Sequence, residues 1–187
     1  MKGGLAMAHE MSKGHSRSSL DNSKLPLKAH DLAFEYERKY GSCPQCVLLA
    51  ISKTFGLKMD DVVKAGHALA GGAALSGSGT CGALTGGMMS LSFIYGRGVE
   101  DVDKGRFLVS YRVAKDLYDM FVEEFGGCTC QEVQKKIFGR SFDMWDAEDY
   151  KEFEKAGGHV EKCAEVAGRV ARWVAEIHLA HGGKPKG

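Results

Sequence analysis

The stretch SGSGTCGALTGGMMSLSFIY, residues 76–95, organises the rest of this chain. It opens as a glycine- and serine-rich loop, a composition that favours positive φ angles and close approach of the backbone to a neighbour. Thr80 is of the residue type that caps a helix N-terminus. Apolar side chains then recur at helical spacing, at Leu84, Met88, Leu91 and Tyr95. The pattern predicts a central helix that follows a glycine-rich loop.

Cys81 falls in the first turn of this predicted helix. Free backbone N–H groups and the positive end of the helix dipole favour an anionic sulfur there, either a free thiolate or a metal-bound one. The alternative is a small buried cysteine packed beside glycines. Five further cysteines in the chain favour the chemical interpretation.

The overall composition excludes several classes of protein. Lys plus Arg number 25 against 24 Asp plus Glu, without a long basic run, so we expect no nucleic-acid partner. No apolar run approaches the roughly 18 residues of a membrane span, and the first twenty residues lack the apolar core of a secretory signal. We therefore expect a soluble, cytoplasmic protein with a polar N-terminal arm (1–20), one helical redox domain (21–181) and a flexible tail (182–187).

The remaining pattern predicts helices and no strand, so the fold class is all-α, a compact multi-helix bundle. Glycines end the segments, and no stretch alternates apolar and polar residues in the manner of a strand. Besides the central helix, the expected helices span about 25–40, 43–57, 60–69, 107–125, 131–139 and 159–181, with one short helix within 140–158.

All six cysteines lie at or near the ends of these helices. They are Cys43, Cys46, Cys81, Cys128, Cys130 and Cys163. Helix ends can converge in a bundle, and thiolate is the soft ligand that both iron–sulfur clusters and zinc prefer. The spacing is neither the cysteine run of bacterial ferredoxins nor the paired knuckles of a zinc ribbon, and no C-x-x-C-H is present, so we expect no covalent haem.

Two other uses of the cysteines remain open at this point. Cys43 and Cys46 form a C-x-x-C pair at a helix start, which would suit a metal-free thiol–disulfide oxidoreductase. A zinc-stabilised interaction module would use the same thiols as structural ligands.

The cysteine segments resemble a known family. Residues 81–86, CGALTG, resemble the Cys-Gly-Ala-x-x-Gly motif of the redox-active C_GCAxxG_C_C family, and the segments SCPQCVLLAISKTFGL, FGGCTCQEV and KCAEVAGRVARWV resemble its other cysteine sites. The resemblance places the four family cysteines on Cys43, Cys81, Cys130 and Cys163; Cys46 and Cys128 are departures from the pattern. The family is similar to part of the split-Soret cytochromes, dimers with haem and iron–sulfur groups.

The resemblance implies an iron–sulfur protein that carries electrons, or performs a small redox step, for a partner protein in anaerobic metabolism. The four family cysteines would be ligands, and Cys46 and Cys128 would complete a larger or second cluster or act as exchangeable ligands. Backbone N–H groups of the glycine-rich loop, including Gly79 and Gly82, would donate to cluster sulfides.

We also expect a two-fold homodimer. The N-terminal arm and the aromatic segment 140–158 have no obvious partner within the chain. The expected interface anchors are Phe142, Trp145 and Tyr150, because large aromatic side chains dominate interface energetics.

Overall fold

The structure is a computed structural model that describes residues 22–185. Within this range it contains helices and no strand, which confirms the all-α prediction. The α-helices are α1 (Leu25–Tyr40), α2 (Cys43–Phe55), α3 (Asp60–Ala65), α4 (Gly82–Tyr95), α5 (Leu108–Phe125), α6 (Cys130–Phe138), α7 (Ala147–Lys155) and α8 (Cys163–Ala180). Shorter turns are η1 (Asn22–Lys24), η2 (His67–Leu69), η3 (Val99–Asp101) and the π-helical turn η4 (Gly158–Lys162).

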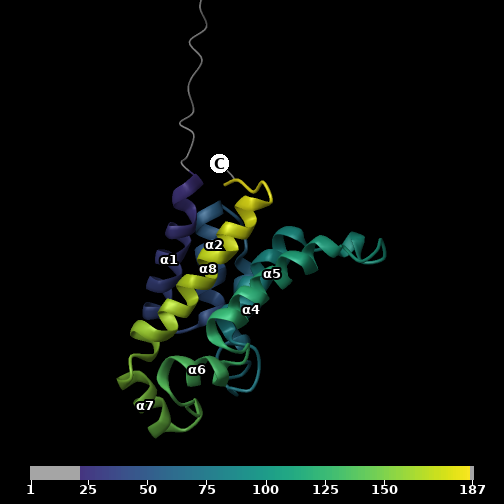
Figure 1. Ribbon diagram of the computed structural model, residues 1–187. Helices are drawn as coiled ribbons and strands as arrows, with labels where there is room; N and C mark the ends of the chain where they lie inside the picture. Colours follow the sequence, from purple (N-terminus) through teal and green to yellow (C-terminus); the bar gives the residue numbers. More distant parts are fainter. Residues whose placement is uncertain (1–21, 186–187) are drawn as a thin grey trace, which may run out of the picture.

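The helices α1 and α8 form the most extensive pair in the bundle and run side by side in opposite directions (Figure 1). Small buried residues line the contact, with Ala29 and Ala33 on α1 and Ala167 and Ala171 on α8. Small side chains let two helices approach closely and bury their apolar stripes without voids. The pair therefore forms a rigid wall against which α2, α4 and α5 pack.

Two glycines of α4 allow α2 to cross it at very short range. A Cβ atom added at Gly82 would lie 2.8 Å from Cδ of Pro44, and one at Gly86 would lie 2.6 Å from the Pro44 carbonyl oxygen. The obstacle at Gly86 is backbone, which a change of rotamer cannot move. The first turn of α2, which begins at Cys43, is thereby held against the first turns of α4.

The loop before α4 contains a left-handed turn that includes residues other than glycine. Residues 71–75 all have positive φ, including Ala73, Ala74 and Leu75. Each such L-residue costs roughly 1–2 kcal/mol relative to the right-handed conformation. Hydrogen bonds hold the turn, among them Gly77 N–H to Gly71 O at 2.9 Å and the Trp145 indole N–H to Ala74 O at 2.9 Å. The turn reverses the chain so that it enters α4 beside α6.

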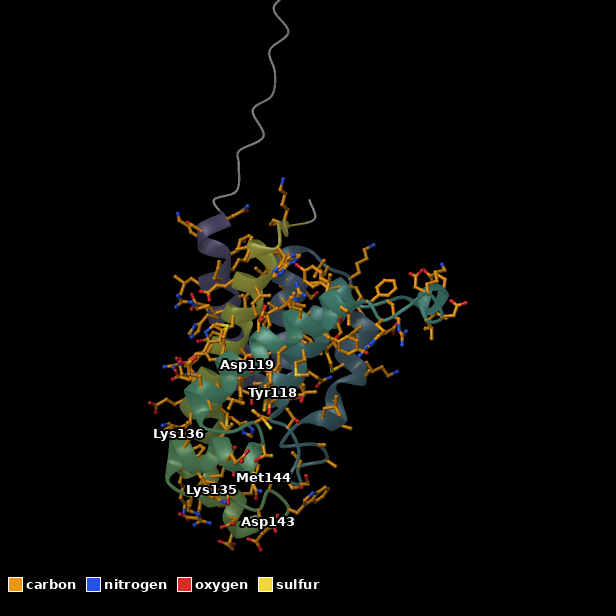
Figure 2. All side chains as sticks on the ribbon, turned by 45° about the vertical axis from the view of Figure 1, so that its right-hand side comes forward. Tyr118, Asp119, Lys135, Lys136, Asp143 and Met144 are labelled. Carbon is orange, nitrogen blue, oxygen red and sulfur yellow. The ribbon has the colours of Figure 1, made fainter. Side chains whose placement is uncertain are left out.

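The segment between α6 and α7 is anchored inside the chain, which corrects one expectation about the dimer anchors. Phe142 is buried, and its ring contacts Phe138 and Phe153 with centroids 5.3 and 5.7 Å away. Its N–H donates to the Gln134 side chain, whose amide in turn contacts Met144 (Figure 2). Phe142 therefore has intrachain partners and is not an anchor for a second subunit.

Most helix boundaries follow the sequence prediction, with three differences. The helix predicted over 60–69 ends at Ala65 and is followed by the separate turn η2. Thr80 pairs with Thr129 in an isolated antiparallel bridge, so Cys81 takes the N-cap position instead. The last predicted helix begins as the π-helical turn η4, and α8 itself starts at Cys163.

The predicted N-terminal arm, residues 1–20, lies outside the described residues. No helix in the described range is long and apolar enough to cross a membrane.

Replacing Gly86 with alanine tests the α2–α4 contact. Alanine gains up to about 1 kcal/mol of helix propensity, but its Cβ meets the Pro44 backbone, so we expect the free energy of unfolding to fall by about 1–2 kcal/mol in urea titrations. Ser92→Ala, on the exposed face of the same helix, should stay within about 0.5 kcal/mol of wild type. An unchanged midpoint for Gly86→Ala would show that the two helices separate without cost.

Candidate functional site

Four cysteines occupy the start of four different helices. Cys43 is the first residue of α2, Cys81 is the N-cap of α4, Cys130 begins α6 and Cys163 begins α8. These helix starts lie at the end of the bundle that faces α6 and α7 (Figure 1). The structure thus brings together residues separated by up to 120 positions in the chain.

The four thiols form one electrostatic group. Each of their six pairings is close enough for the charge of one thiolate to raise the pKa of the other. Cys81 is buried, whereas Cys43, Cys130 and Cys163 keep partial exposure. Although these three residues are partly exposed, the thiols themselves are buried enough for desolvation to be the largest effect on their pKa values.

Burial controls the protonation of these thiols. It raises the pKa of Cys43 and Cys163 well above the usual range, with Glu37 and the other thiols adding to the effect. Burial raises the pKa of Cys130 to about 12 and that of Cys81 to about 11, although the N–H groups of Ala83 and Leu84 lower the latter. The helix start thus favours thiolate at Cys81 as the sequence indicated, but burial outweighs it.

Backbone pairing fixes Cys81 beside the start of α6. The Cys81 N–H donates to Cys128 O at 2.8 Å, and the Cys130 N–H donates to Gly79 O at 3.0 Å. A capping box between Thr129 and Glu132 defines the first turn of α6, because each side chain accepts from the other's backbone N–H.

The two glycines expected to donate to a cofactor have other roles. The N–H of Gly79 already donates to Gly72 O at 3.0 Å, so it is not free to reach a cluster sulfide. Gly82 contributes by lacking a side chain where Pro44 approaches. The N–H groups directed at the Cys81 sulfur come instead from Ala83 and Leu84.

The two additional cysteines sit at different sides of the group. Cys46 is buried one turn into α2, where it interacts with Glu37, and burial raises the pKa of its thiol. Cys128 lies beside Cys81 and close to Tyr118 on α5, whose hydroxyl pKa it raises (Tyr118 is labelled in Figure 2). Neither is among the four mutually close thiols.

Glu37 is the residue at this site that the sequence reasoning missed. Its side chain is fully buried at the C-terminal end of α1, next to the thiols of Cys43 and Cys46. It continues the buried stripe of Leu25, Ala29 and Ala33 at intervals of four residues. The sequence signal that could have identified Glu37 is a carboxylate at a position where the spacing of the helix predicts a buried apolar residue.

A histidine and a second carboxylate lead from Glu37 to the surface. Nε2 of His159, on η4, lies 3.9 Å from Glu37 Oε1, beyond hydrogen-bonding distance. Nδ1 of the same ring lies 2.6 Å from Oε1 of Glu154, which is one-third exposed. The π-helical turn places His159 over Gly41, whose positive φ makes the tight turn from α1 to α2.

The donor atoms can be compared with the ligands that metal centres use. Within residues 22–185, no three Cys, His, Asp or Glu side chains are close enough together to hold one metal ion. Cysteine thiolates are the usual ligands of iron–sulfur clusters. Four converging thiols and an unpaired buried carboxylate fit such a group in their chemistry.

A comparison with known families bears on the same region. The family profile described as "Putative redox-active protein (C_GCAxxG_C_C)" matches residues 41–177, which include all six cysteines. No curated protein and no solved structure gives a significant match.

The protonation of the thiols gives a test on the metal-free protein. The thiol of Cys81 ionises near pH 9 in the unfolded chain but near 11 when folded. The unfolded state therefore binds fewer protons between these values, and the free energy of unfolding should be fully retained below about pH 9 and fall as the pH rises toward 11. Stability measured by urea titration from pH 7 to 11, and alkylation with iodoacetamide, check this.

We expect alkylation of the folded protein to stay slow at pH 8 and to accelerate above pH 10. Protein unfolded in urea is the control, and its thiols should react at the ordinary rate at pH 8. A folded-state thiol that reacts rapidly below pH 8 would contradict the effect of burial.

Proposed function

The chain belongs to the C_GCAxxG_C_C redox-active protein family, and from this premise we propose that it is an iron–sulfur-cluster-binding electron-transfer protein. The observation that carries the proposal is the convergence of Cys43, Cys81, Cys130 and Cys163 from four helix starts. These four residues would be the ligands. A bound cluster would supply a one-electron carrier.

The surroundings of the four thiols support a metal-bound state. Without a metal, their raised pKa values keep them protonated and therefore weak nucleophiles. A metal cation compensates the negative charge of the thiolates and displaces their protons. The N–H groups of Ala83 and Leu84 would stabilise the bound Cys81 sulfur, and the partial exposure of three ligands would leave the centre near a partner's surface.

Cys128 and Cys46 would have secondary roles. Cys128 lies near Tyr118 and adjoins Cys81, so it would lie beside the centre without ligating it. Cys46 lies behind Cys43 and next to Glu37, on the buried side of the group.

Replacing cysteines tests the ligand assignment. After anaerobic purification we expect iron and acid-labile sulfide in the wild-type protein, and we expect both to fall several-fold in each of the serine variants at Cys43, Cys81, Cys130 and Cys163. Cys128→Ser is the matched control, since its side chain points to Tyr118, and it should retain most of the iron. A colourless wild-type protein without iron or sulfide would refute the cluster.

The second candidate function is thiol–disulfide exchange through Cys43 and Cys46, and one observation favours it. A buried carboxylate, Glu37, lies next to both thiols and could accept a proton from one of them. Oxidation of the pair to a disulfide would release two electrons and two protons to a disulfide substrate. The raised pKa of both thiols opposes this function, because exchange requires a thiolate. Rapid alkylation of this pair at neutral pH would favour it.

A zinc-stabilised interaction module would use the same four thiols as structural ligands. Metal analysis distinguishes the zinc module from the iron–sulfur protein. The zinc module requires that the protein contain zinc, show no visible absorption, and unfold when the metal is chelated.

For the cellular setting, we propose the cytoplasm of a cell with anaerobic metabolism, and a separate protein as redox partner. All six cysteines lie in the described range and are free of disulfides, as expected in a reducing compartment.

A homodimer remains our proposal for assembly, with Trp145 and Tyr150 kept as anchors, Phe142 removed, and apolar residues near η3 added. The chain around η3 extends away from the bundle (Figure 1) and exposes apolar side chains, including Val99, which is 90% exposed, Leu108 and Val109. Trp145 and Tyr150 are also exposed. An apolar surface of this kind is typical of a protein contact.

Light scattering tests the assembly. We expect the full chain to be a dimer at tens of micromolar, and Leu108→Glu with Val109→Glu to shift it to monomer. A protein that begins at Leu20 tests the N-terminal arm separately. A wild-type chain that stays monomeric would exclude the dimer.

A further inference from the structure

The buried carboxylate of Glu37 lacks a strong hydrogen-bond donor. Its side chain is fully buried, and neither Oε1 nor Oε2 accepts a hydrogen bond from an N–H or O–H group in the described range; its polar neighbours are the thiols of Cys43 and Cys46 and, at 3.9 Å, Nε2 of His159. The other buried side-chain atoms of this kind are the hydroxyls of Ser42 and Thr54, which are neutral. Glu37 is therefore the one ionisable side chain in the described range that is buried in this unpaired state.

Protonation would not satisfy this side chain. A neutral carboxylic acid still carries one O–H donor and a carbonyl acceptor, and both would remain without partners. His159 is too distant at 3.9 Å. The thiols of Cys43 and Cys46 are close enough to donate to the carboxylate, but a thiol is only a weak donor.

Helix packing does not explain the residue either. Leu25, Ala29 and Ala33 fill the preceding positions of the same stripe, so an apolar residue at position 37 would continue the contact with α8 and α2. A charged residue in a buried apolar stripe, without a partner that compensates its charge, is expected at a functional site where a ligand binds. The thiols are the groups next to which such a partner would bind, because Cys43 and Cys46 contact the carboxylate and Cys81 and Cys163 lie close enough to feel its charge.

We propose that Glu37 is a carboxylate ligand of the metal centre held by Cys43, Cys81, Cys130 and Cys163. This inference rests on the proposed function and adds a fifth donor to it. Iron accepts both carboxylate oxygen and thiolate sulfur. One oxygen-bound iron would differ electronically from the sulfur-bound ones. Iron at this position would give the carboxylate the partner that the protein does not supply.

The test compares Glu37→Gln, Glu37→Leu and Glu37→Asp with wild type, all as full-length chains loaded anaerobically with ferrous iron and sulfide. Glu35→Gln is the matched control, since Glu35 is an exposed carboxylate on the same helix. The measurements are iron per chain, the rate of iron loss to a ferrous chelator, the Mössbauer spectrum, and the melting temperature of the metal-free protein.

If Glu37 is a ligand, Glu37→Gln and Glu37→Leu should lose iron at least about tenfold faster than wild type. Glu37→Asp, which keeps the carboxylate, should restore part of the difference, and the Mössbauer signal of the oxygen-bound iron should disappear from Glu37→Gln. The metal-free Glu37→Leu protein should melt a few degrees higher than wild type, because the unpaired group is gone. Glu35→Gln should match wild type throughout.

Two results would overturn the inference while leaving the cluster in place. Glu37→Gln with wild-type iron content, release rate and spectrum would show that an amide suffices and that no carboxylate ligand exists. A lower melting temperature for metal-free Glu37→Leu together with an unchanged spectrum of Glu37→Gln would assign Glu37 a structural role. A wild-type chain that binds no iron would instead refute the proposed function, and the ligand role with it.

Discussion

The contact between the first turn of α2 and the face of α4 is the constraint on which the rest of the site depends. At Gly86 the Pro44 backbone approaches so closely that even a methyl group would collide with it. This contact brings Cys43 to Cys81, although 37 positions lie between them. Because the obstacle is main chain, the spacing of the two helices cannot adapt through side-chain rotation.

The other half of the site is attached by a different kind of interaction. Hydrogen bonds between the backbone of the loop before α4 and that of residues 128–131 hold α6 in place, and the π-helical turn η4 sets the start of α8. Such turns are frequent at functional sites. Steric fit thus positions α2 against α4, whereas main-chain hydrogen bonds position α6 and the turn η4 sets the start of α8. The positions of the four thiols therefore do not depend on a single contact.

Electrostatics make the metal-free site unfavourable. The buried carboxylate of Glu37, which lacks a strong donor, reduces the stability that the surrounding packing provides, whereas the thiols stay protonated and pack as small apolar groups. Family membership indicates redox chemistry for this region. A cationic centre would compensate the charge of the carboxylate and of the thiolates that bind it, which is why we propose metal binding over free thiol chemistry at this end of the bundle.

The sequence by itself determined the helices and the position of the cysteines on them. Glycines end α1, α2, α5 and α6, and the four family cysteines fall at helix starts, because caps and periodicity are local properties that a single segment encodes. Only the tertiary structure decided which groups surround those cysteines. The placement of Glu37 and His159, the pairing of Thr80 with Thr129, and the burial that reverses the effect of the helix dipole on Cys81 all depend on segments far apart in the chain. Their relative rotation and distance follow from close packing, which no local pattern records.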